Sequence, residues 1–173
     1  LTEDASVSVL LLEAGGKDPF WAWQIHMPAA LAYPMNGDRY SWNYLSEPES
    51  LLNGRSIHCP RGRVLGGSSA INGMVYIRGN ALDYDRWAAE DRALSEWDYA
   101  HCLPYFKKSE TLAADTGDYH GGSGPLHITR GDISRELCDA FVKAATQAGY
   151  PQTPDMNGAQ QEGFGRMDRT TKE

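Results

Sequence analysis

The clearest pattern of apolar and polar positions lies between residues 134 and 148. Apolar side chains recur there at helical spacing, at Leu137, Phe141, Ala145 and Ala148. Ser134 is a capping residue type, and Gly149 suits the position that follows the last helical residue. The pattern predicts an amphipathic helix over 134–148.

Three weaker patterns predict further helices. Residues 81–89 have helical spacing, and Asp98 is placed to cap a helix that reaches about Thr111. Pro104 lies inside that second segment, so the helix either begins there or kinks. Residues 25–33 hold a weaker helical signal.

Strand signals are short. Residues 40–44 are rich in aromatic side chains and favour an extended conformation, and residues 126–129 are a further strand candidate. Asn53-Gly54 favours positive φ at both residues, which predicts a hairpin turn. Strands and helices together indicate a mixed α and β fold.

Residues 7–12 read Val-Ser-Val-Leu-Leu-Leu, a short run that is apolar apart from Ser8. Such a run is typical of a parallel strand that is covered on both faces. Glu13 follows it, and then Gly15 and Gly16. In dinucleotide-binding folds an acidic residue at this end of a strand accepts hydrogen bonds from the adenosine ribose.

Composition excludes some functions. The chain has 173 residues and a formal net charge of −7, which argues against nonspecific binding to nucleic acid or anionic lipid. Three cysteines without a Cys-x-x-Cys motif indicate free thiols rather than a zinc site. No apolar run is long enough for a transmembrane segment, and no signal peptide is visible. Since the sequence opens Leu-Thr-Glu-Asp, we expect that it has lost its true start.

Residues 62–73 read Gly-Arg-Val-Leu-Gly-Gly-Ser-Ser-Ala-Ile-Asn-Gly, and they are the most informative segment. Paired glycines and serines at the start of a helix can present backbone N–H groups to a phosphate. A P-loop is excluded because Ser68 stands where its lysine must be. The motif Gly-x-Gly-x-x-Gly is absent, so if Glu13 binds a ribose, the glycine turn lies upstream of Leu1. The alternative is a flexible turn at 66–69 and an exposed strand end at Glu13.

The segment 62–79 closely resembles the first signature of the glucose–methanol–choline (GMC) oxidoreductases. Residues 83–87 and 10–16 fit the same family in order and spacing, and within it the chain is most similar to bacterial choline-oxidising members. The resemblance implies an α/β fold, an incomplete FAD-binding Rossmann-like domain. It implies that 1–130 belong to the FAD-binding domain and that 131–173 start a substrate-domain segment, truncated at its end.

The resemblance also implies FAD as the cofactor. Its contacts would come from Glu13, Gly15, Gly66, Gly67, Ser68, Ser69, Asn72, Gly73, Met74 and Val75. Glu13 would hold the ribose, residues 66–69 would follow the pyrophosphate and ribityl chain, and residues 72–75 would run beside the flavin ring. Some relatives attach FAD to a histidine in this motif, but Ile71 stands at that place and predicts non-covalent binding.

The family reaction implies hydride transfer from a primary alcohol to flavin N5, with oxidation of choline to betaine aldehyde as the leading case. The histidine that assists it is expected beyond Glu173, so no catalytic residue is assigned in this chain. His120 is expected to be a turn histidine with a structural hydrogen bond. The electron acceptor stays open, and the expected location is cytoplasmic or peripheral to a membrane.

Three alternatives remain open on sequence alone. The parent protein is either choline-oxidising or another GMC alcohol oxidase or dehydrogenase, and the chain by itself is either a working enzyme segment or an inactive flavin-binding fragment. Arg61 and Arg63 either neutralise phosphate or pair with surface acids.

Overall fold

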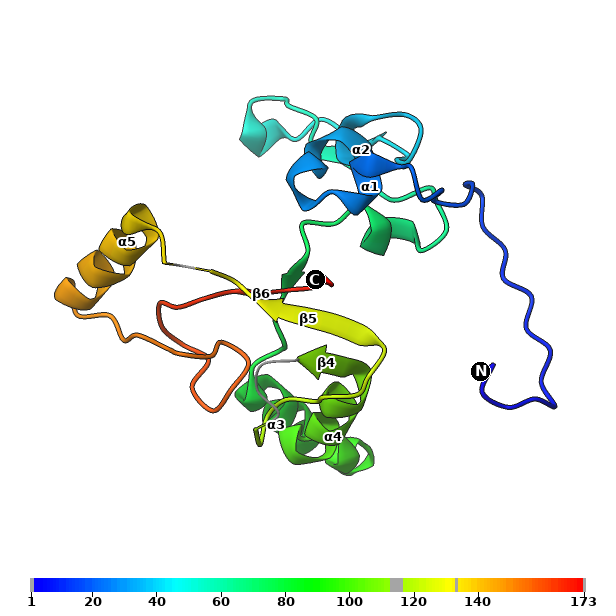
Figure 1. The fold of residues 1–173 in the computed structure, drawn as a ribbon. Helices are drawn as coiled ribbons and strands as arrows, with labels where there is room; N and C mark the ends of the chain where they lie inside the picture. Colours follow the sequence, from blue (N-terminus) through cyan, green and yellow to red (C-terminus); the bar gives the residue numbers. More distant parts are fainter. Residues whose placement is uncertain (1, 113–116, 133, 173) are drawn as a thin grey trace. The chain divides into compact units, whose positions relative to one another are not determined.

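The computed structural model describes residues 2–112, 117–132 and 134–172. The chain divides into two compact units, Leu1–Gly73 and Met74–Glu173, and each is described by itself (Figure 1). This division differs from the one expected between residues 130 and 131, because compactness is a different criterion from cofactor or substrate binding. The assignment of 1–130 and 131–173 to those two roles therefore stays a prediction.

The first unit is built from short elements around a small core. In order they are α1 (Trp23–His26), η1 (Pro28–Ala30), α2 (Ala32–Asn36), β1 (Tyr44–Leu45), η2 (Ser50–Leu52), β2 (His58–Cys59) and η3 (Gly67–Ala70). The weak helical signal of residues 25–33 thus corresponds to three short helical pieces. The buried core consists of Ala22, Tyr40, Val64 and Ile71. Two of these four residues come from the glycine-rich segment, so the core holds that segment in place.

β1 and β2 form an antiparallel pair in which Tyr44 lies opposite Cys59. The chain reverses at Asn53 and Gly54, whose φ values of 57° and 72° are both positive. The predicted turn is confirmed, because these two residues tolerate the left-handed conformation better than other residue types.

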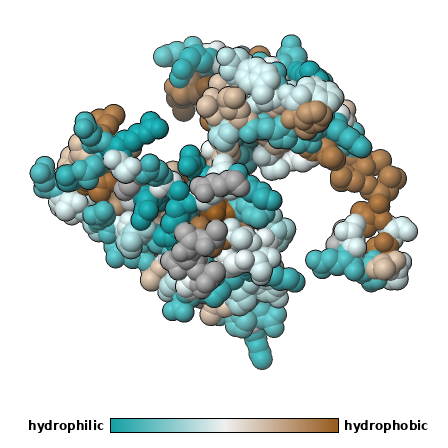
Figure 2. Space-filling view, viewed as in Figure 1, coloured by the Kyte–Doolittle hydropathy of each residue, from teal (hydrophilic) through white to brown (hydrophobic). Residues whose placement is uncertain are grey.

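The strand predicted over residues 7–12 is wrong for the described part of the chain. The segment is extended but belongs to no strand, and its leucines are exposed, Leu10 to 83% and Leu12 to 82%. It forms the brown run near the N-terminus in Figure 2. A β-strand needs hydrogen-bonded neighbours, and none of the described residues supplies a ladder here.

The second unit contains a four-stranded sheet with the order β3-β6-β5-β4. Its elements are β3 (Val75–Tyr76), α3 (Ala81–Glu90), η4 (Arg92–Trp97), α4 (Tyr99–Ser109), β4 (Glu110–Leu112), β5 (Leu126–Arg130), α5 (Glu136–Gln147) and β6 (Asp168–Arg169). β4 runs parallel to β5, whereas β6 pairs antiparallel with β5 and β3. α4 leads directly into β4 (Figure 1).

The helices predicted over 81–89, from Asp98 and over 134–148 are confirmed as α3, α4 and α5, with shifts of one or two residues at their ends. Asp98 caps α4 by accepting the N–H of His101 at 2.8 Å, and Pro104 lies inside that helix. α5 begins at Glu136 with Arg135 at the N-cap position, so Ser134 lies one residue too early to cap the helix as expected. Gly149 has φ +88° and follows α5 as predicted.

α5 is the longest described helix, with 12 residues, and no described helix is long and apolar enough to cross a membrane.

Candidate functional site

Residues 13–16, which follow the apolar run 7–12, lie against the glycine-rich segment 62–73 within the first unit. Gly16 and Val64 form a parallel bridge, and the Leu65 N–H donates to the Gly16 carbonyl at 2.9 Å. A Cβ at Gly15 would collide with the Arg63 carbonyl. The two backbones therefore approach as closely as only glycine permits, and this brings two separately predicted parts of the site together.

Glu13 lies two residues before this contact, and its side chain is exposed. Its Oε1 accepts the N–H of Gly15 at 2.8 Å. A carboxylate has two oxygens and about four acceptor positions, so it can accept a hydroxyl group in addition to this N–H.

Internal hydrogen bonds fix the conformation of the glycine-rich turn. Gly66 has φ +96°, and the Gly67 N–H donates to the Val64 carbonyl at 2.7 Å. The Ser68 hydroxyl accepts the Gly62 N–H at 3.0 Å, while the Ser69 hydroxyl donates to the Gly66 carbonyl at 2.6 Å. The predicted helix start is therefore the short 3₁₀ helix η3 rather than an α-helix.

The glycines of residues 13–16 and 62–73, which together form a glycine-rich surface, have two different surroundings. A Cβ at Gly62 would collide with the Gly67 carbonyl, just as one at Gly15 would collide with Arg63. By contrast, a Cβ at Gly16, Gly67 or Gly73 would meet no protein atom within 4 Å. Exposed backbone without side-chain cover fits a ligand that lies flat along the chain, as a dinucleotide does.

The rest of the predicted cofactor segment continues across the two units. Ile71 is only 4% exposed and packs in the first core, whereas Asn72 and Gly73 are exposed. Met74 and Val75 belong to the second unit, where Val75 pairs with Arg169 in the sheet. Met74 has φ +61°, which is uncommon for any residue other than glycine and marks a strained position.

Arg61 and Arg63 bond to backbone carbonyls. Arg61 Nη1 donates to the Pro60 carbonyl at 2.7 Å, and Arg63 Nη2 donates to the Asp38 carbonyl at 2.6 Å. The Arg63 guanidinium also lies 5.3 Å from the centre of the Trp42 ring. Of the two alternatives, pairing with surface carboxylates is not observed among the described residues, and the contacts with carbonyl groups do not neutralise the arginine charges.

Sequence reasoning missed a buried charged cluster in the second unit. It contains Arg78, Glu110, His120, Asp155 and Asp168, with Arg130 beside it. The structural role expected for His120 is confirmed, since both ring nitrogens are hydrogen-bonded. A weak signal existed in His120-Gly121, because a Cβ at Gly121 would collide with the Lys107 carbonyl. The carboxylate partners are too distant in sequence to be found by pattern.

Three ligand atoms of that cluster, from His120, Asp155 and Asp168, lie within 4.8 Å of one another, as in a metal site. However, His120 Nε2 is bonded to Asp155, and Asn157 donates to Asp168 at 3.0 Å. A guanidinium from Arg130 also lies 3.1 Å from Asp155. Because these groups already neutralise and occupy the carboxylates, no metal is assigned.

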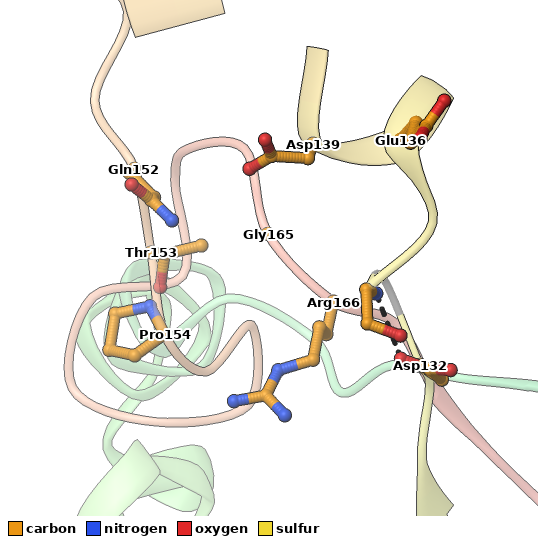
Figure 3. Close-up of a pocket in the computed structure, with 9 residues that line it drawn as sticks. Asp132, Glu136, Asp139, Gln152, Thr153, Pro154, Gly165 and Arg166 are labelled. Atoms are coloured by element: carbon orange, nitrogen blue, oxygen red, sulfur yellow. Dashed lines mark hydrogen bonds between the residues drawn. The ribbon is translucent and has the colours of Figure 1, made fainter. Parts of the chain in front are cut away.

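A cavity of about 530 Å³ lies between α5 and the loop around Thr153 (Figure 3). Its acidic lining comes from Asp132, Glu136 and Asp139, and Arg166 reaches its edge. The Asp132 carboxylate accepts hydrogen bonds from Ser134, which lower its pKa. All three acidic residues are exposed, so the cavity lacks the buried carboxylate that is typical of a general-base site.

Comparison with known proteins places these features in context. Residues 5–173 match the family described as GMC oxidoreductase. The chain is 58% identical over 171 residues to an oxygen-dependent choline dehydrogenase of Paraburkholderia phymatum, and 57% identical to one of Pseudomonas aeruginosa. Each match covers 98% of this chain and 30% of the relative, so the chain spans about a third of their length.

Solved structures are similar to this chain over nearly its whole length, at lower sequence identity. The pyridoxine 4-oxidase of Mesorbium loti superposes with a TM-score of 0.87 at 31% identity, covering 100% of this chain and 33% of that one. An FAD-dependent oxidoreductase of Chaetomium thermophilum superposes with a TM-score of 0.85, also at 31% identity, covering 99% of this chain and 30% of that one.

Proposed function

The chain belongs to the GMC oxidoreductase family, and from that premise we propose that its parent protein is an FAD-dependent choline dehydrogenase. Membership confirms the resemblance and the α/β fold class expected from sequence, and proteins of this family bind FAD. The assignment of choline as the substrate is a more specific proposal than family membership. It is supported by 58% identity to choline dehydrogenases against 31% to pyridoxine 4-oxidase.

One observation carries the cofactor assignment: Gly15 and Gly16 lie directly against Arg63, Val64 and Leu65. This contact puts the Glu13 carboxylate beside a glycine-lined surface with open space over it. Glu13 would accept a ribose hydroxyl, and residues 66–69 would hold the pyrophosphate along their backbone.

Residues 72–75 would line the flavin ring. When bound, FAD supplies the hydride acceptor, its N5 atom, for the carbon that bears the alcohol. The chain's own residues would orient and shield the flavin. Met74 is anchored for this role because its carbonyl accepts the Thr170 N–H at 2.8 Å. No residue of this chain is assigned as the acid or base.

FAD is proposed to be bound without a covalent link. The side chain at Ile71 is a buried hydrocarbon, which has no nucleophilic atom to attach to the flavin. Acid precipitation of the purified holoenzyme should therefore release the flavin into the supernatant, whereas yellow colour that stays in the pellet would contradict the proposal.

The second candidate is a GMC oxidase for another alcohol, which the fold similarity to pyridoxine 4-oxidase favours. A third is that these 173 residues bind flavin weakly and are inactive by themselves. Both alternatives share the cofactor surface with the first, so substrate tests rather than flavin binding distinguish the two enzymes.

The test uses the full-length protein that carries this segment, purified with its flavin. Oxygen uptake and flavin bleaching are measured with choline, pyridoxine and simple primary alcohols. We expect the highest kcat/KM for choline and bleaching of the flavin by choline in the absence of oxygen. Turnover of another alcohol without choline activity would reject the substrate, and a protein without flavin would reject the cofactor assignment.

A further inference from the structure

His120 is a buried histidine in the described part of the connection between β4 and β5. Its side chain is 2% exposed, and each ring nitrogen faces a carboxylate. Nδ1 lies 2.8 Å from Glu110 Oε1, and Nε2 lies 2.7 Å from Asp155 Oδ2. Glu110 itself is fully buried at the start of β4.

These two contacts define the protonation state of the ring. Ionised carboxylates only accept hydrogen bonds, and a neutral imidazole carries one N–H. Two short contacts to two carboxylates therefore require an N–H on both nitrogens, which is the imidazolium. Hydrogen bonding to Glu110 raises the pKa of His120, and the bond to Asp155 raises it further against the opposing effect of burial.

The charges around the ring lead to the same state. Three carboxylates surround it, those of Glu110, Asp155 and Asp168, and two guanidinium groups come from Arg78 and Arg130. Arg78 Nη2 lies 2.9 Å from Glu110 Oε1, and Arg130 Nη2 lies 3.1 Å from Asp155 Oδ2. Among the described groups, two guanidinium charges face three carboxylates, and a protonated His120 supplies the third positive charge. Uncompensated charge is costly in a buried site.

The same contacts join segments that are far apart in the sequence. Asp155 lies in the loop 151–165, between α5 and β6, whereas Glu110 starts β4. The loop also reaches Arg78, two residues after β3. Asn157 Oδ1 accepts the Arg78 N–H at 2.8 Å, and Gln161 donates to the Arg78 carbonyl at 2.7 Å. His120 is therefore the central link between the sheet and this loop.

We propose that His120 is a proton-dependent clamp, which holds the loop 151–165 against β4 as long as its ring is an imidazolium. This role is independent of flavin binding and of the substrate. Deprotonation removes one N–H and leaves the carboxylates of Glu110 and Asp155 facing a neutral ring, so the loop is released from the sheet while the remainder of the second unit keeps its fold.

The pH dependence has two limbs. The pKa of His120 is raised above its ordinary 6.5, so its contribution is complete below about 6.5 and is lost as the pH rises through the higher folded pKa. Burial alone would raise the pKa of Glu110, but hydrogen bonds from His120, Tyr76 and Arg78 lower it to about 2. The contribution of Glu110 is therefore complete above about 4.5 and is lost as the pH falls toward 2. Together they predict the tightest loop between about 4.5 and 6.5.

Hydrogen–deuterium exchange of the full-length protein tests the clamp, because it follows the loop peptide by itself. The reporters are the amides of Thr153, bonded to the Phe164 carbonyl at 3.0 Å, and of Phe164, bonded to the Pro151 carbonyl at 2.9 Å. After correction for intrinsic exchange, protection of residues 151–165 should fall by about tenfold or more between pH 6 and pH 9. Peptides from residues 40–62 should keep their protection.

Two variants separate the clamp from a general effect of pH. His120→Gln should show low loop protection at both pH values, because an amide cannot donate to both carboxylates. His127→Gln, a control at an exposed histidine of β5, should behave like the wild type. Equal wild-type protection at pH 6 and pH 9 would overturn the proposal, and that measurement stands even if His120→Gln does not fold.

Discussion

The glycine-rich surface of the first unit and the charged cluster of the second unit use opposite kinds of contact. On the first surface, backbone meets backbone at Gly15 and Arg63, and open space remains over Gly16 and Gly67. In the cluster, side chains meet side chains, and the buried ring of His120 has a partner on each nitrogen. A site that keeps exposed backbone is suited to a ligand, whereas a site whose charges neutralise one another is suited to holding the fold.

This difference explains why a perturbed pKa is a poor guide to function here. The pKa of Glu110 is lowered to about 2, and Glu110 lies in the structural cluster. Glu13, which is proposed to contact the cofactor, is an exposed carboxylate. Structural ion-pair networks perturb pKa values as strongly as active sites do, so geometry has to decide between the two.

The largest effect is expected from Glu110→Gln. The substitution leaves Arg78 and His120 facing a neutral amide inside the protein, and breaking a buried ion pair in this way costs about 3–5 kcal/mol of unfolding free energy. Urea unfolding followed by tryptophan fluorescence measures it.

Asp83→Asn is the matched control for that experiment. Asp83 pairs with Arg86 at 3.0 Å on the surface, where an ion pair contributes about 0–1 kcal/mol. If both variants lose the same small amount of stability, the cluster does not hold the second unit together.

A smaller effect separates the two kinds of glycine. Gly15→Ala forces a methyl group into the Arg63 carbonyl, and we expect a loss of about 1–3 kcal/mol in unfolding free energy together with loss of FAD. Gly16→Ala meets no protein atom within 4 Å, so stability of the apoprotein should stay within about 1 kcal/mol of the wild type while FAD binding weakens. Flavin fluorescence titration and urea unfolding of the apoprotein check both; equal apoprotein stabilities would contradict the close approach at Gly15.

Sequence could predict what depends on local chemistry. The αL turn at Asn53-Gly54, the cap at Asp98 and the glycine after α5 are all confirmed, because each depends on one or two residues and their own backbone. The GMC signature likewise located the glycine-rich segment, although which of its residues contact FAD remains a prediction.

Sequence could not predict what depends on distant partners. Residues 7–12 have the composition of a buried strand, yet a strand forms only where neighbouring strands complete its hydrogen bonds. Glu110, His120 and Asp155 are likewise brought together only by the sheet and the loop 151–165. Ser134 does not have its expected role because α5 starts one residue later than predicted, with Arg135 at the N-cap position.

The most direct test of the central claim is the FAD affinity of Glu13→Gln in the full-length protein. An amide accepts a ribose hydroxyl more weakly than a carboxylate, so the Kd of FAD should rise by about tenfold, which corresponds to about 1.4 kcal/mol. Glu47→Gln, at an exposed carboxylate of the same unit, is the control and should leave the Kd unchanged. An unchanged Kd for Glu13→Gln would contradict the placement of the ribose at Glu13.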